Sequence, residues 1–145
     1  MKKLFTKICI ASDHAGYALK EKIKDYLINN NISLIDLGPF SEDSVDYPDY
    51  AKKVAKRLIL RKSDAGILIC GSGTGMAITA NKFKEIRAAQ CYNKISTILS
   101  RQHNNSNVIC LGSRMLKYKE AIKYVTYFLN TKFENGRHQK RIKKI

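Results

Sequence analysis

Short apolar runs alternate with amphipathic stretches along the whole chain, and this alternation predicts the fold class. A strand followed by a helix is the repeating unit of a parallel sheet, because the helix returns the chain to the start of the next strand. Right-handed crossovers then place helices on both faces. We therefore expect an α/β fold, a Rossmann-like three-layer sandwich with a five-stranded parallel sheet. The strands are expected at residues 8–11, 34–37, 65–69, 87–91 and 108–111.

The amphipathic stretches predict the helices. Between the first two strands, Leu19, Ile23 and Leu27 recur at the spacing of one helix face, and a run of asparagines ends the pattern. Pro48 is favourable in the first turn of the next helix. No linker or repeat interrupts the series, so we predict a single domain spanning residues 1–145. The helices are expected at residues 15–28, 48–60, 75–82, 95–102 and 119–130.

The third apolar run ends in Cys70 and continues into a loop with alternating glycines, Gly71, Gly73 and Gly75. Glycines permit positive φ and let a ligand approach the backbone N–H groups, and the following helix adds the positive end of its dipole. The loop is a candidate anion site, with a tight strand-to-helix turn as the plainer alternative. Cys70, with its thiolate stabilised there, is a candidate nucleophile or base. The spacing matches neither the dinucleotide fingerprint nor the P-loop, so no nucleotide cofactor is expected.

The other three cysteines are expected to be structural. Cys9, Cys91 and Cys110 lie among aliphatic residues, where a free thiol behaves as a small hydrophobic group. Their wide spacing contains no CxxC pair, so neither a disulfide framework nor a zinc site is expected. We therefore expect no metal and no cofactor.

The net charge of +15 raises the question of a nucleic-acid partner. Lysines scattered over the predicted helix faces supply most of it, and no basic-aromatic motif accompanies them. We interpret them as a solvated surface and expect no nucleic-acid partner. No apolar run approaches the roughly 18 residues of a membrane span, so no membrane partner is expected. The segment 1–5 is too short for a signal peptide, and we expect a cytoplasmic location.

Polar residues follow the carboxyl ends of the predicted strands, where ligands bind in doubly wound sheets. Asp13 and His14 come after the first strand, and Arg114 comes after the fifth. Asp13 has an equally good explanation as a helix cap, and a cap can also contact a ligand. His14 is either an exposed histidine or a phosphate donor at a helix N-terminus.

Four further candidates lie near predicted helix ends. His103 and Asn104 end a helix, where a cation interacts favourably with the dipole and an asparagine can serve as a cap. His103 precedes the fifth strand by a short loop, which is a weaker placement for a site residue. Arg137 and Arg141 stand four residues apart and share one face of a helix, an arrangement that suits bidentate phosphate recognition. The alternative is a solvated charged tail.

Seven segments of the chain, in order and over nearly its whole length, together resemble ribose 5-phosphate isomerase type B. The wider family includes the galactose 6-phosphate isomerase subunits. The segments are SDHAG at 12–16, VDYP at 45–48, ICGSGTG at 69–75, ANK at 80–82, SRQHN at 100–104, LGSR at 111–114 and GRHQKR at 136–141.

The resemblance implies an aldose–ketose isomerase of the non-oxidative pentose phosphate pathway that needs no metal. It would interconvert ribose 5-phosphate and ribulose 5-phosphate through a cis-enediolate. Cys70 would be the base that moves a proton between C1 and C2, and His103 would open the furanose ring with help from Asp13 or Asp46. One branch of the family replaces the cysteine by a glutamate directly after the last glycine; Met76 occupies that position here, which indicates the cysteine branch.

The resemblance also implies a homodimer, or a tetramer of such dimers, with the active site at the subunit interface. The basic segment 131–145 would pack on the partner subunit and bring its arginines to the phosphate. The enediolate oxygens would be held by the loop, namely Gly71, Ser72, Gly73, Thr74 and Gly75. The phosphate would be bound by His14, Arg114, Arg137 and Arg141, and the sugar would be contacted by Asp46, Tyr47 and Asn104.

Three alternatives remain open from the sequence. The same chemistry on a six-carbon phosphate, such as allose or galactose 6-phosphate, is the nearest one. A non-catalytic sensor of phosphate ligands would bind tightly without isomerisation. Nucleic-acid binding through the basic surface would weaken steeply with salt. The presence of both Cys70 and His103 argues against the last two.

Overall fold

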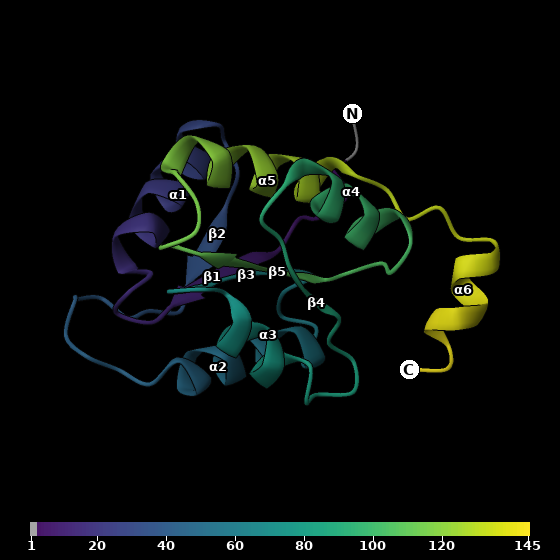
Figure 1. Cartoon of the computed structure of the whole chain (residues 1–145), viewed down its shortest axis with the longest axis horizontal. Coiled ribbons are helices and arrows are strands. Elements are labelled where there is room, and N and C mark those ends of the chain that lie inside the picture. The colour runs from purple at the N-terminus through teal and green to yellow at the C-terminus, as the bar shows by residue number, and fades with distance from the viewer. Residues whose placement is uncertain (1–2) are drawn as a thin grey trace.

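The computed structural model describes residues 3–145. Its centre is an all-parallel sheet with strand order β2-β1-β3-β5-β4 (Figure 1). The strands are β1 (Ile8–Ser12), β2 (Leu34–Asp36), β3 (Ala65–Cys70), β4 (Ala88–Gln90) and β5 (Val108–Gly112). The predicted α/β fold class and the five strands are thereby confirmed. The order reverses between β1 and β3, and this switch point is where ligands bind in sheets of this kind.

The helices form a layer on each face of the sheet. Figure 1 shows α1, α4 and α5 on one face and α2 and α3 on the other, while α6 projects from the end of the sandwich. The predicted helices lie within two residues of the observed ones. The observed helices are α1 (Tyr17–Asn29), α2 (Tyr47–Ile59), α3 (Thr74–Ala80), α4 (Lys94–Gln102), α5 (Tyr118–Asn130) and α6 (Arg137–Ile142).

The three central strands, β1, β3 and β5, are almost entirely apolar because both of their faces are buried, whereas the edge strands β2 and β4 are only partly buried. Alternate residues point to opposite layers: Ile10 and Ile67 join the cluster beneath α1 and α5, whereas Cys9 and Leu68 join the one beneath α2 and α3. Fully burying an isoleucine or leucine side chain stabilises a fold by about 1.5–3 kcal/mol. Packing in the two clusters holds the strands in place, and the loops at the carboxyl ends of the strands are anchored by it.

The three cysteines predicted to be structural are buried free thiols. Burial raises the pKa of Cys9 to about 11 and also raises that of Cys91. Cys110, which is 0% exposed, has its pKa raised well above the ordinary value for the same reason. These thiols therefore stay protonated and act as small apolar groups, as expected.

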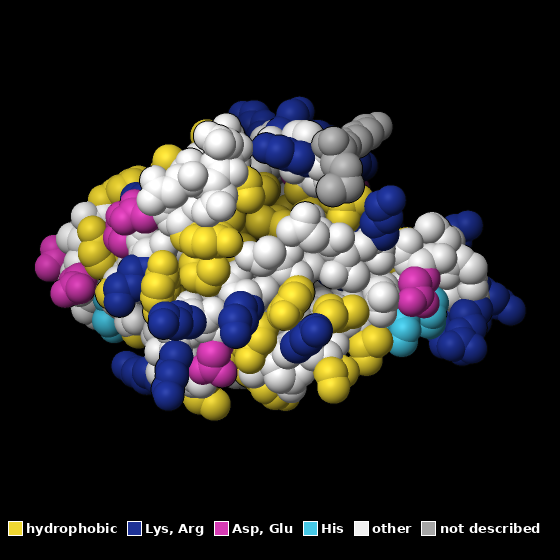
Figure 2. Space-filling view, turned by 90° about the horizontal axis from the view of Figure 1, so that it is seen from above, with side chains coloured by type: hydrophobic (Ala, Val, Ile, Leu, Met, Phe, Trp, Pro, Cys, Tyr) yellow, Lys and Arg dark blue, Asp and Glu magenta, His cyan; other side chains and the backbone are white. Residues whose placement is uncertain are grey.

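The surface charge is dispersed. Figure 2 shows lysines and arginines scattered between hydrophobic and uncharged side chains on the face that it presents. Among residues 3–145, no helix has the length and apolar character needed to cross a membrane. The expectation about a signal peptide concerns residues 1–5, of which Met1 and Lys2 lie outside the described part of the chain.

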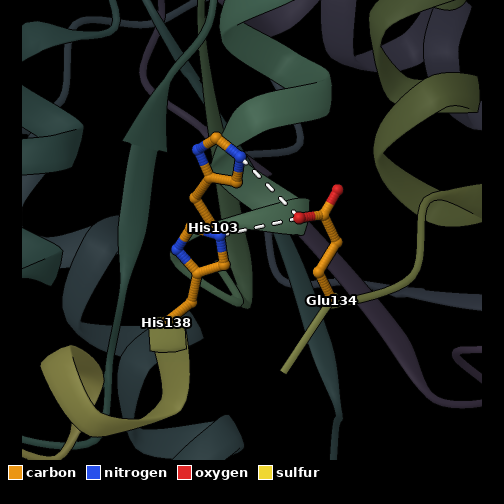
Figure 3. Close-up of side chains that lie close together, drawn as sticks. All are labelled: His103, Glu134 and His138. Carbon is orange, nitrogen blue, oxygen red and sulfur yellow. Dashed lines mark ion pairs between the residues drawn. The ribbon is translucent and has the colours of Figure 1, made fainter. Parts of the chain in front are cut away.

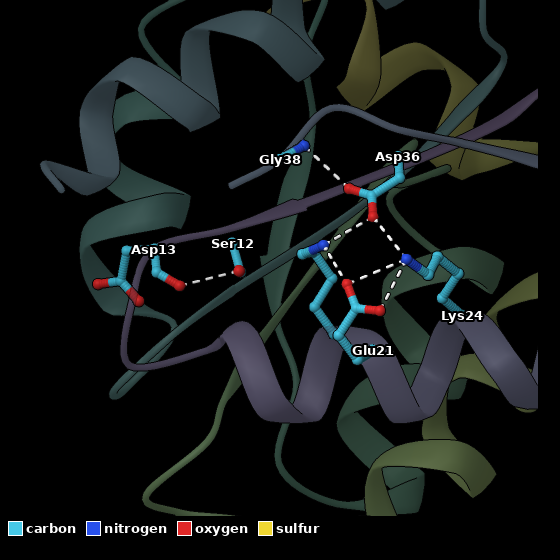
Figure 4. A network of polar contacts seen from close by, with 7 residues as sticks. Ser12, Asp13, Glu21, Lys24, Asp36 and Gly38 are labelled. Carbon is cyan, nitrogen blue, oxygen red and sulfur yellow. Dashed lines mark hydrogen bonds and ion pairs between the residues drawn. The ribbon is translucent and has the colours of Figure 1, made fainter. Parts of the chain in front are cut away.

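A network of four charged side chains joins α1 to the end of β2 (Figure 4). Lys20, whose side chain is 0% exposed, lies 2.7 Å from Asp36 and 2.8 Å from Glu21, and Lys24 contacts the same two carboxylates. Asp36 also accepts a 2.9 Å hydrogen bond from the Gly38 amide. Burial by itself would raise the pKa of Asp36, but the hydrogen bonds from Lys20, Gly38 and Lys24 outweigh it and hold that pKa below its ordinary value.

The network holds one end of the loop 39–46, which leads into α2. The amide of Ser12, at the end of β1, donates to the carbonyl of Gly38 at 3.0 Å. The charged network therefore fixes the start of this loop against the end of β1. The loop's other end returns to the same edge of the sheet, beside His14.

Candidate active site

The carboxyl ends of β1 and β3 bring two of the predicted site residues together. Ser12 pairs with Ile69 in the parallel register, and the Asp13 amide donates to the Ile69 carbonyl at 3.1 Å. Ser12 and Ile69 form the last aligned pair of these two neighbouring strands, and Asp13 and Cys70 are the residues that follow it. This is the switch point of the sheet, so the structure places the candidate chemistry where a ligand would enter.

The sulfur of Cys70 faces the glycine loop. Its Sγ accepts a hydrogen bond from the Gly73 amide at 3.1 Å, a contact that favours negative charge on sulfur. The bend needs a φ of +81° at Gly73, which glycine adopts without strain. Cys70 is only 4% exposed, so it is more enclosed than a residue expected at the mouth of a site, because its side chain also belongs to the hydrophobic cluster beneath α2 and α3. The adjoining Ser72 and Thr74 are exposed, while Gly73 between them is buried.

Two side chains lie against the loop's glycines. A Cβ at Gly75 would come within 2.6 Å of the Tyr47 ring, and one at Gly71 would come within 3.0 Å of the Arg114 guanidinium. Both glycines thus leave room for functional side chains from other elements. Tyr47 and Arg114 are brought to the Cys70 loop as the sequence predicted.

Gln90, at the end of β4, was not predicted. Its side-chain amide donates to the Ser72 carbonyl at 2.9 Å and to the Thr74 hydroxyl at 2.8 Å. It therefore holds the loop in place through two of its residues. Gln90 is the last residue of a short strand, and no sequence pattern predicts that its side chain contacts the Cys70 loop.

A cleft of about 560 Å³ lies between the end of β1 and the start of α2. It is lined by Asp13, His14, Asp46 and Tyr47, among others. The His14 Nδ1 lies 3.2 Å from both the amide nitrogen and the carbonyl oxygen of Val45, which ties the loop 39–46 to the end of β1. Asp13 accepts a 3.0 Å hydrogen bond from the Gly16 amide just before α1. The prediction that Asp13 caps the helix is wrong, because Gly16 is the N-cap of α1 and no side chain caps this helix. The Asp13 carboxylate instead closes the turn that precedes the helix, and it lines the cleft.

His103 and Asn104 lie at the other edge of the sheet. The helix α4 joins two parallel strands, so its C-terminal end, which His103 caps, lies near the amino ends of the strands. Asn104 accordingly lines a different cavity, together with residues that precede β4. Within one chain, His103 and Cys70 therefore do not converge, which agrees with the weaker placement that the sequence gives His103. The reason is that helices run antiparallel to the strands in this architecture.

Arg137 and Arg141 belong to α6, at the same end of the molecule as His103. The segment is helical, which is the condition for the two arginines to share one face, and both arginines are exposed on it. In Figure 1 this helix stands at the opposite end of the sandwich from the β1 and β3 tips. A single chain thus holds two separate groups of candidate residues. We call the one around Cys70 the carboxyl-edge group and the one around His103 the amino-edge group.

Two residues of the amino-edge group were not predicted, Glu134 and His138. Figure 3 shows their side chains converging with that of His103. The imidazoles of His103 and His138 stack with centroids 4.2 Å apart, and their Nε2 atoms lie 3.9 Å and 3.6 Å from one Glu134 oxygen. Burial, together with the charges of His103 and Arg137, lowers the pKa of His138. The four-residue spacing of Glu134 and His138 was the only signal available.

A further cavity lies away from Cys70. It has a volume of about 610 Å³, and its lining includes Arg87 and Arg101 near the amino ends of the strands. Arg87 donates to the Asn105 carbonyl, and Arg101 donates to the carbonyls of Thr131 and Ser106. Both guanidiniums therefore serve to hold turns, and burial lowers the pKa of each.

Comparison with known proteins finds relatives that share both the fold and much of the sequence of this chain. A family model described as Ribose/Galactose Isomerase matches residues 8–145. A ribose 5-phosphate isomerase from Thermotoga maritima has a crystal structure similar to this one, with a TM-score of 0.94 and 49% identity over 96% of each chain. Ribose-5-phosphate isomerase B from Mycoplasma genitalium, crystallised with bound ribulose-5-phosphate, gives a TM-score of 0.89 at 46% identity over 95% of this chain and 92% of that one.

The curated relatives carry names of two kinds. Ribose-5-phosphate isomerase B of Escherichia coli is 43% identical over 139 residues, which are 96% of this chain and 93% of the relative. Others are named only by the broader class, sugar phosphate isomerase. The names thus agree on the chemistry and differ in how closely they specify the sugar.

Proposed function

This chain belongs to the ribose/galactose isomerase family of sugar phosphate isomerases, and we propose that its substrates are ribose 5-phosphate and ribulose 5-phosphate. The observation on which the proposal rests is the Cys70 sulfur, held 3.1 Å from the Gly73 amide in a glycine loop whose Ser72 and Thr74 are exposed. A relative that is 46% identical binds ribulose-5-phosphate, which supports a five-carbon sugar.

In the proposed reaction, Cys70 acts as the base on the open-chain sugar. Its thiolate takes the proton from C2 of the aldose, the electrons move to the carbonyl oxygen at C1, and the resulting cis-enediolate receives the proton back at C1. The first-turn amides of α3, at Gly75 and Met76, have no partner within that helix and can face the developing charge. Each such donor contributes roughly 2.7–4 kcal/mol in comparable sites. The Ser72 hydroxyl, in the same loop, would exchange the proton between the two oxygens.

The aldose must first be opened from its furanose ring, and this step needs the amino-edge group. We assign it to His103 of the partner subunit, because within one chain His103 and Cys70 lie at opposite edges of the sheet. The imidazole accepts the proton of the anomeric hydroxyl while the ring oxygen is protonated and the C1–O bond of the ring breaks. Asp13 and Asp46, which line the cleft, are the candidates to supply that proton.

A two-fold contact across the edge strand β4 would bring the two groups together. A two-fold axis perpendicular to the strands reverses their direction, so the carboxyl edge of one subunit faces the amino edge of the other. Exposed hydrophobic residues on the elements flanking β4 support this edge as the interface. They are Ile78 at 59% exposure, Tyr92 at 57%, Ile95 at 71% and Leu99 at 39%.

The phosphate would then be bound from both subunits. His14 and Arg114 approach it from the carboxyl-edge group, and Arg137 and Arg141 of the partner subunit approach it from α6. The two arginines stand one helical turn apart and are exposed, which suits bidentate contacts with a dianion. The position of α6, projecting from its own subunit, supports a role on the neighbouring one (Figure 1).

Parallel assays on ribose 5-phosphate, allose 6-phosphate and galactose 6-phosphate test the choice of sugar. We expect kcat/KM for ribose 5-phosphate to exceed the other two by at least roughly 10-fold, since an added CH–OH unit displaces the phosphate from fixed cations. A preference for either six-carbon sugar would replace the proposed substrate while leaving the isomerase chemistry in place. Binding of all three without turnover would identify a sensor instead.

A further inference from the structure

Two chain segments form the surroundings of His103. His103 caps α4, and Glu134 lies in the connection between α5 and α6. The Glu134 amide donates to the carbonyl of Gln102 at 3.0 Å, so the connection is pinned to the residue just before His103. His138 follows one turn later, in α6. The backbone therefore fixes Glu134 and His138 relative to the imidazole of His103.

The side chains are arranged around one face and one nitrogen of that imidazole (Figure 3). The His138 ring lies parallel to it, with 14° between the planes, and only 8% of the His138 side chain is exposed. The His103 side chain is 38% exposed. His138 is thus the buried support, and His103 is the ring that a ligand can reach.

Glu134 faces a single nitrogen of His103. Its Oε2 is 3.9 Å from the Nε2 of His103, while the Nδ1 points away from the carboxylate (Figure 3). Within residues 3–145, that Nδ1 takes part in no hydrogen bond. At 3.9 Å the carboxylate is beyond direct hydrogen-bond distance, and its negative charge favours the tautomer with the proton on Nε2, which leaves Nδ1 as the base.

The same three side chains could be compared with a metal site, since their ligand atoms lie within 4.8 Å of one another. The surroundings oppose that reading. Arg137 and Arg141 lie on the same short helix as His138, and their positive charge disfavours a divalent cation. The parallel stack also directs the two Nε2 atoms side by side toward the carboxylate.

We propose that Glu134 and His138 are positioning residues for the ring-opening step, a proposal that rests on the proposed function. Glu134 holds the His103 tautomer that has its proton on Nε2 and stabilises the imidazolium formed when Nδ1 accepts the anomeric proton. His138 supports the ring from behind and prevents it from rotating. Neither residue touches the reacting carbon atoms in this assignment.

The proposal concerns one step only. Ribulose 5-phosphate forms no furanose ring, because its C5 oxygen carries the phosphate, and it reaches Cys70 already open. Exchange of a C1 proton of ribulose 5-phosphate with solvent deuterium needs the base and the enediolate but no ring opening. Isomerisation that starts from ribose 5-phosphate needs all of these steps. If Glu134 and His138 act by positioning His103, their loss lowers the rate of isomerisation from ribose 5-phosphate but not the rate of deuterium exchange into ribulose 5-phosphate. A general structural defect would lower both rates together.

The test compares wild type with Glu134→Gln and His138→Ala in both reactions. For Glu134→Gln we expect kcat on ribose 5-phosphate to fall roughly 10- to 100-fold, the usual effect of removing a group that orients a functional histidine. The initial rate of deuterium exchange into ribulose 5-phosphate, followed by NMR, should stay within about 2-fold of wild type. His138→Ala should show the same separation, and His138→Phe, which keeps the stacked ring, should recover most of the lost rate.

Lys140→Gln, an exposed change on α6, is the matched control and should leave both rates unchanged. Equal losses in the two reactions, or no loss in either, would overturn the proposal. Failure of the proposed function has a different signature, because wild type itself would then show neither isomerisation of ribose 5-phosphate nor exchange into ribulose 5-phosphate.

Discussion

The carboxyl-edge group and the amino-edge group are built in opposite ways. The carboxyl-edge group lies at the ends of buried strands, and its Asp13 and Cys70 are only 7% and 4% exposed. The sheet fixes the backbone amides of its loops. The second lies on a helix end, a connecting segment and the projecting helix α6, and its His103 and Arg137 are accessible. One group is rigid because of the core of its own chain, and the other is open toward a neighbour.

The difference follows the chemistry assigned to each group. Proton transfer between adjacent carbons depends on sub-ångström placement, which a strand end held between two hydrophobic clusters provides. Ring opening and phosphate binding tolerate groups that arrive with a second subunit. In a two-fold dimer, each subunit would supply one group to each of two sites.

The largest expected effect comes from the carboxyl-edge group. Cys70→Ala should lower kcat by roughly 10³-fold, because the base is removed and proton transfer by a positioned group contributes about 10²–10⁴-fold. Substrate affinity, measured by isothermal titration calorimetry, should change little, since the sulfur is not a binding contact. Cys110→Ala is the matched control: it removes a buried thiol on the neighbouring strand and should lower the melting temperature without a comparable loss of turnover.

Mixing two inactive variants tests whether the groups act across subunits. A hybrid dimer of Cys70→Ala and His103→Ala chains has one site with both defects and one with neither. Statistical mixing by co-refolding makes half of the dimers hybrid, so we expect about a quarter of wild-type activity to return. If the mixture remained as inactive as the Cys70→Ala and His103→Ala variants alone, both groups of each site would come from the same chain.

The phosphate contacts of the amino-edge group should show a smaller effect. Arg137→Ala should raise KM roughly 10- to 100-fold, the cost of losing charge-assisted hydrogen bonds of about 1.5–3 kcal/mol. Lys140→Ala on the same helix removes a charge of equal sign and serves as the control. Steady-state kinetics on ribose 5-phosphate give both values, and an unchanged KM in Arg137→Ala would remove this arginine from the phosphate site.

The charged network beneath the carboxyl-edge group should affect stability more than turnover. Asp36→Asn leaves the buried Lys20 with Glu21 as its remaining partner, and we expect a loss of roughly 2–3 kcal/mol in the free energy of unfolding near neutral pH. The folded-state pKa of Asp36 is lowered, so its contribution is present above the unfolded value of about 3.9 and is lost as pH falls below it.

Urea unfolding at several pH values measures this difference. The gap between wild type and Asp36→Asn should be largest at neutral pH and should narrow below about pH 4. A gap independent of pH would mean that the lost packing of the carboxylate, rather than its charge, accounts for the change.

Much of the carboxyl-edge group could be predicted from the sequence. The apolar run before Cys70 and the glycines after it mark a buried strand and a loop, and strand ends of a parallel sheet meet at one edge. Gln90 could not be found in this way, because its contacts with Ser72 and Thr74 depend on which strand lies next to which.

The amino-edge group shows what sequence leaves undecided. The helix before β5 was predicted, and the four-residue spacing put the two arginines on one face for the case that their segment is helical. Their distance from Cys70 depends on the direction in which each helix runs, and the meeting of Glu134 with His103 depends on one backbone hydrogen bond to Gln102. Local periodicity contains no information on such contacts.

The sequence by itself determined the alternation of strands and helices, the buried character of three cysteines and the position of the glycine loop, because these follow from hydrophobic periodicity and backbone freedom close along the chain. Only the tertiary structure decided the strand order, the burial of Cys70 in the cluster beneath α2 and α3, and the separation of Cys70 from His103. These features arise from packing between distant segments, where each residue's surroundings are set by parts of the chain that its own neighbours do not specify.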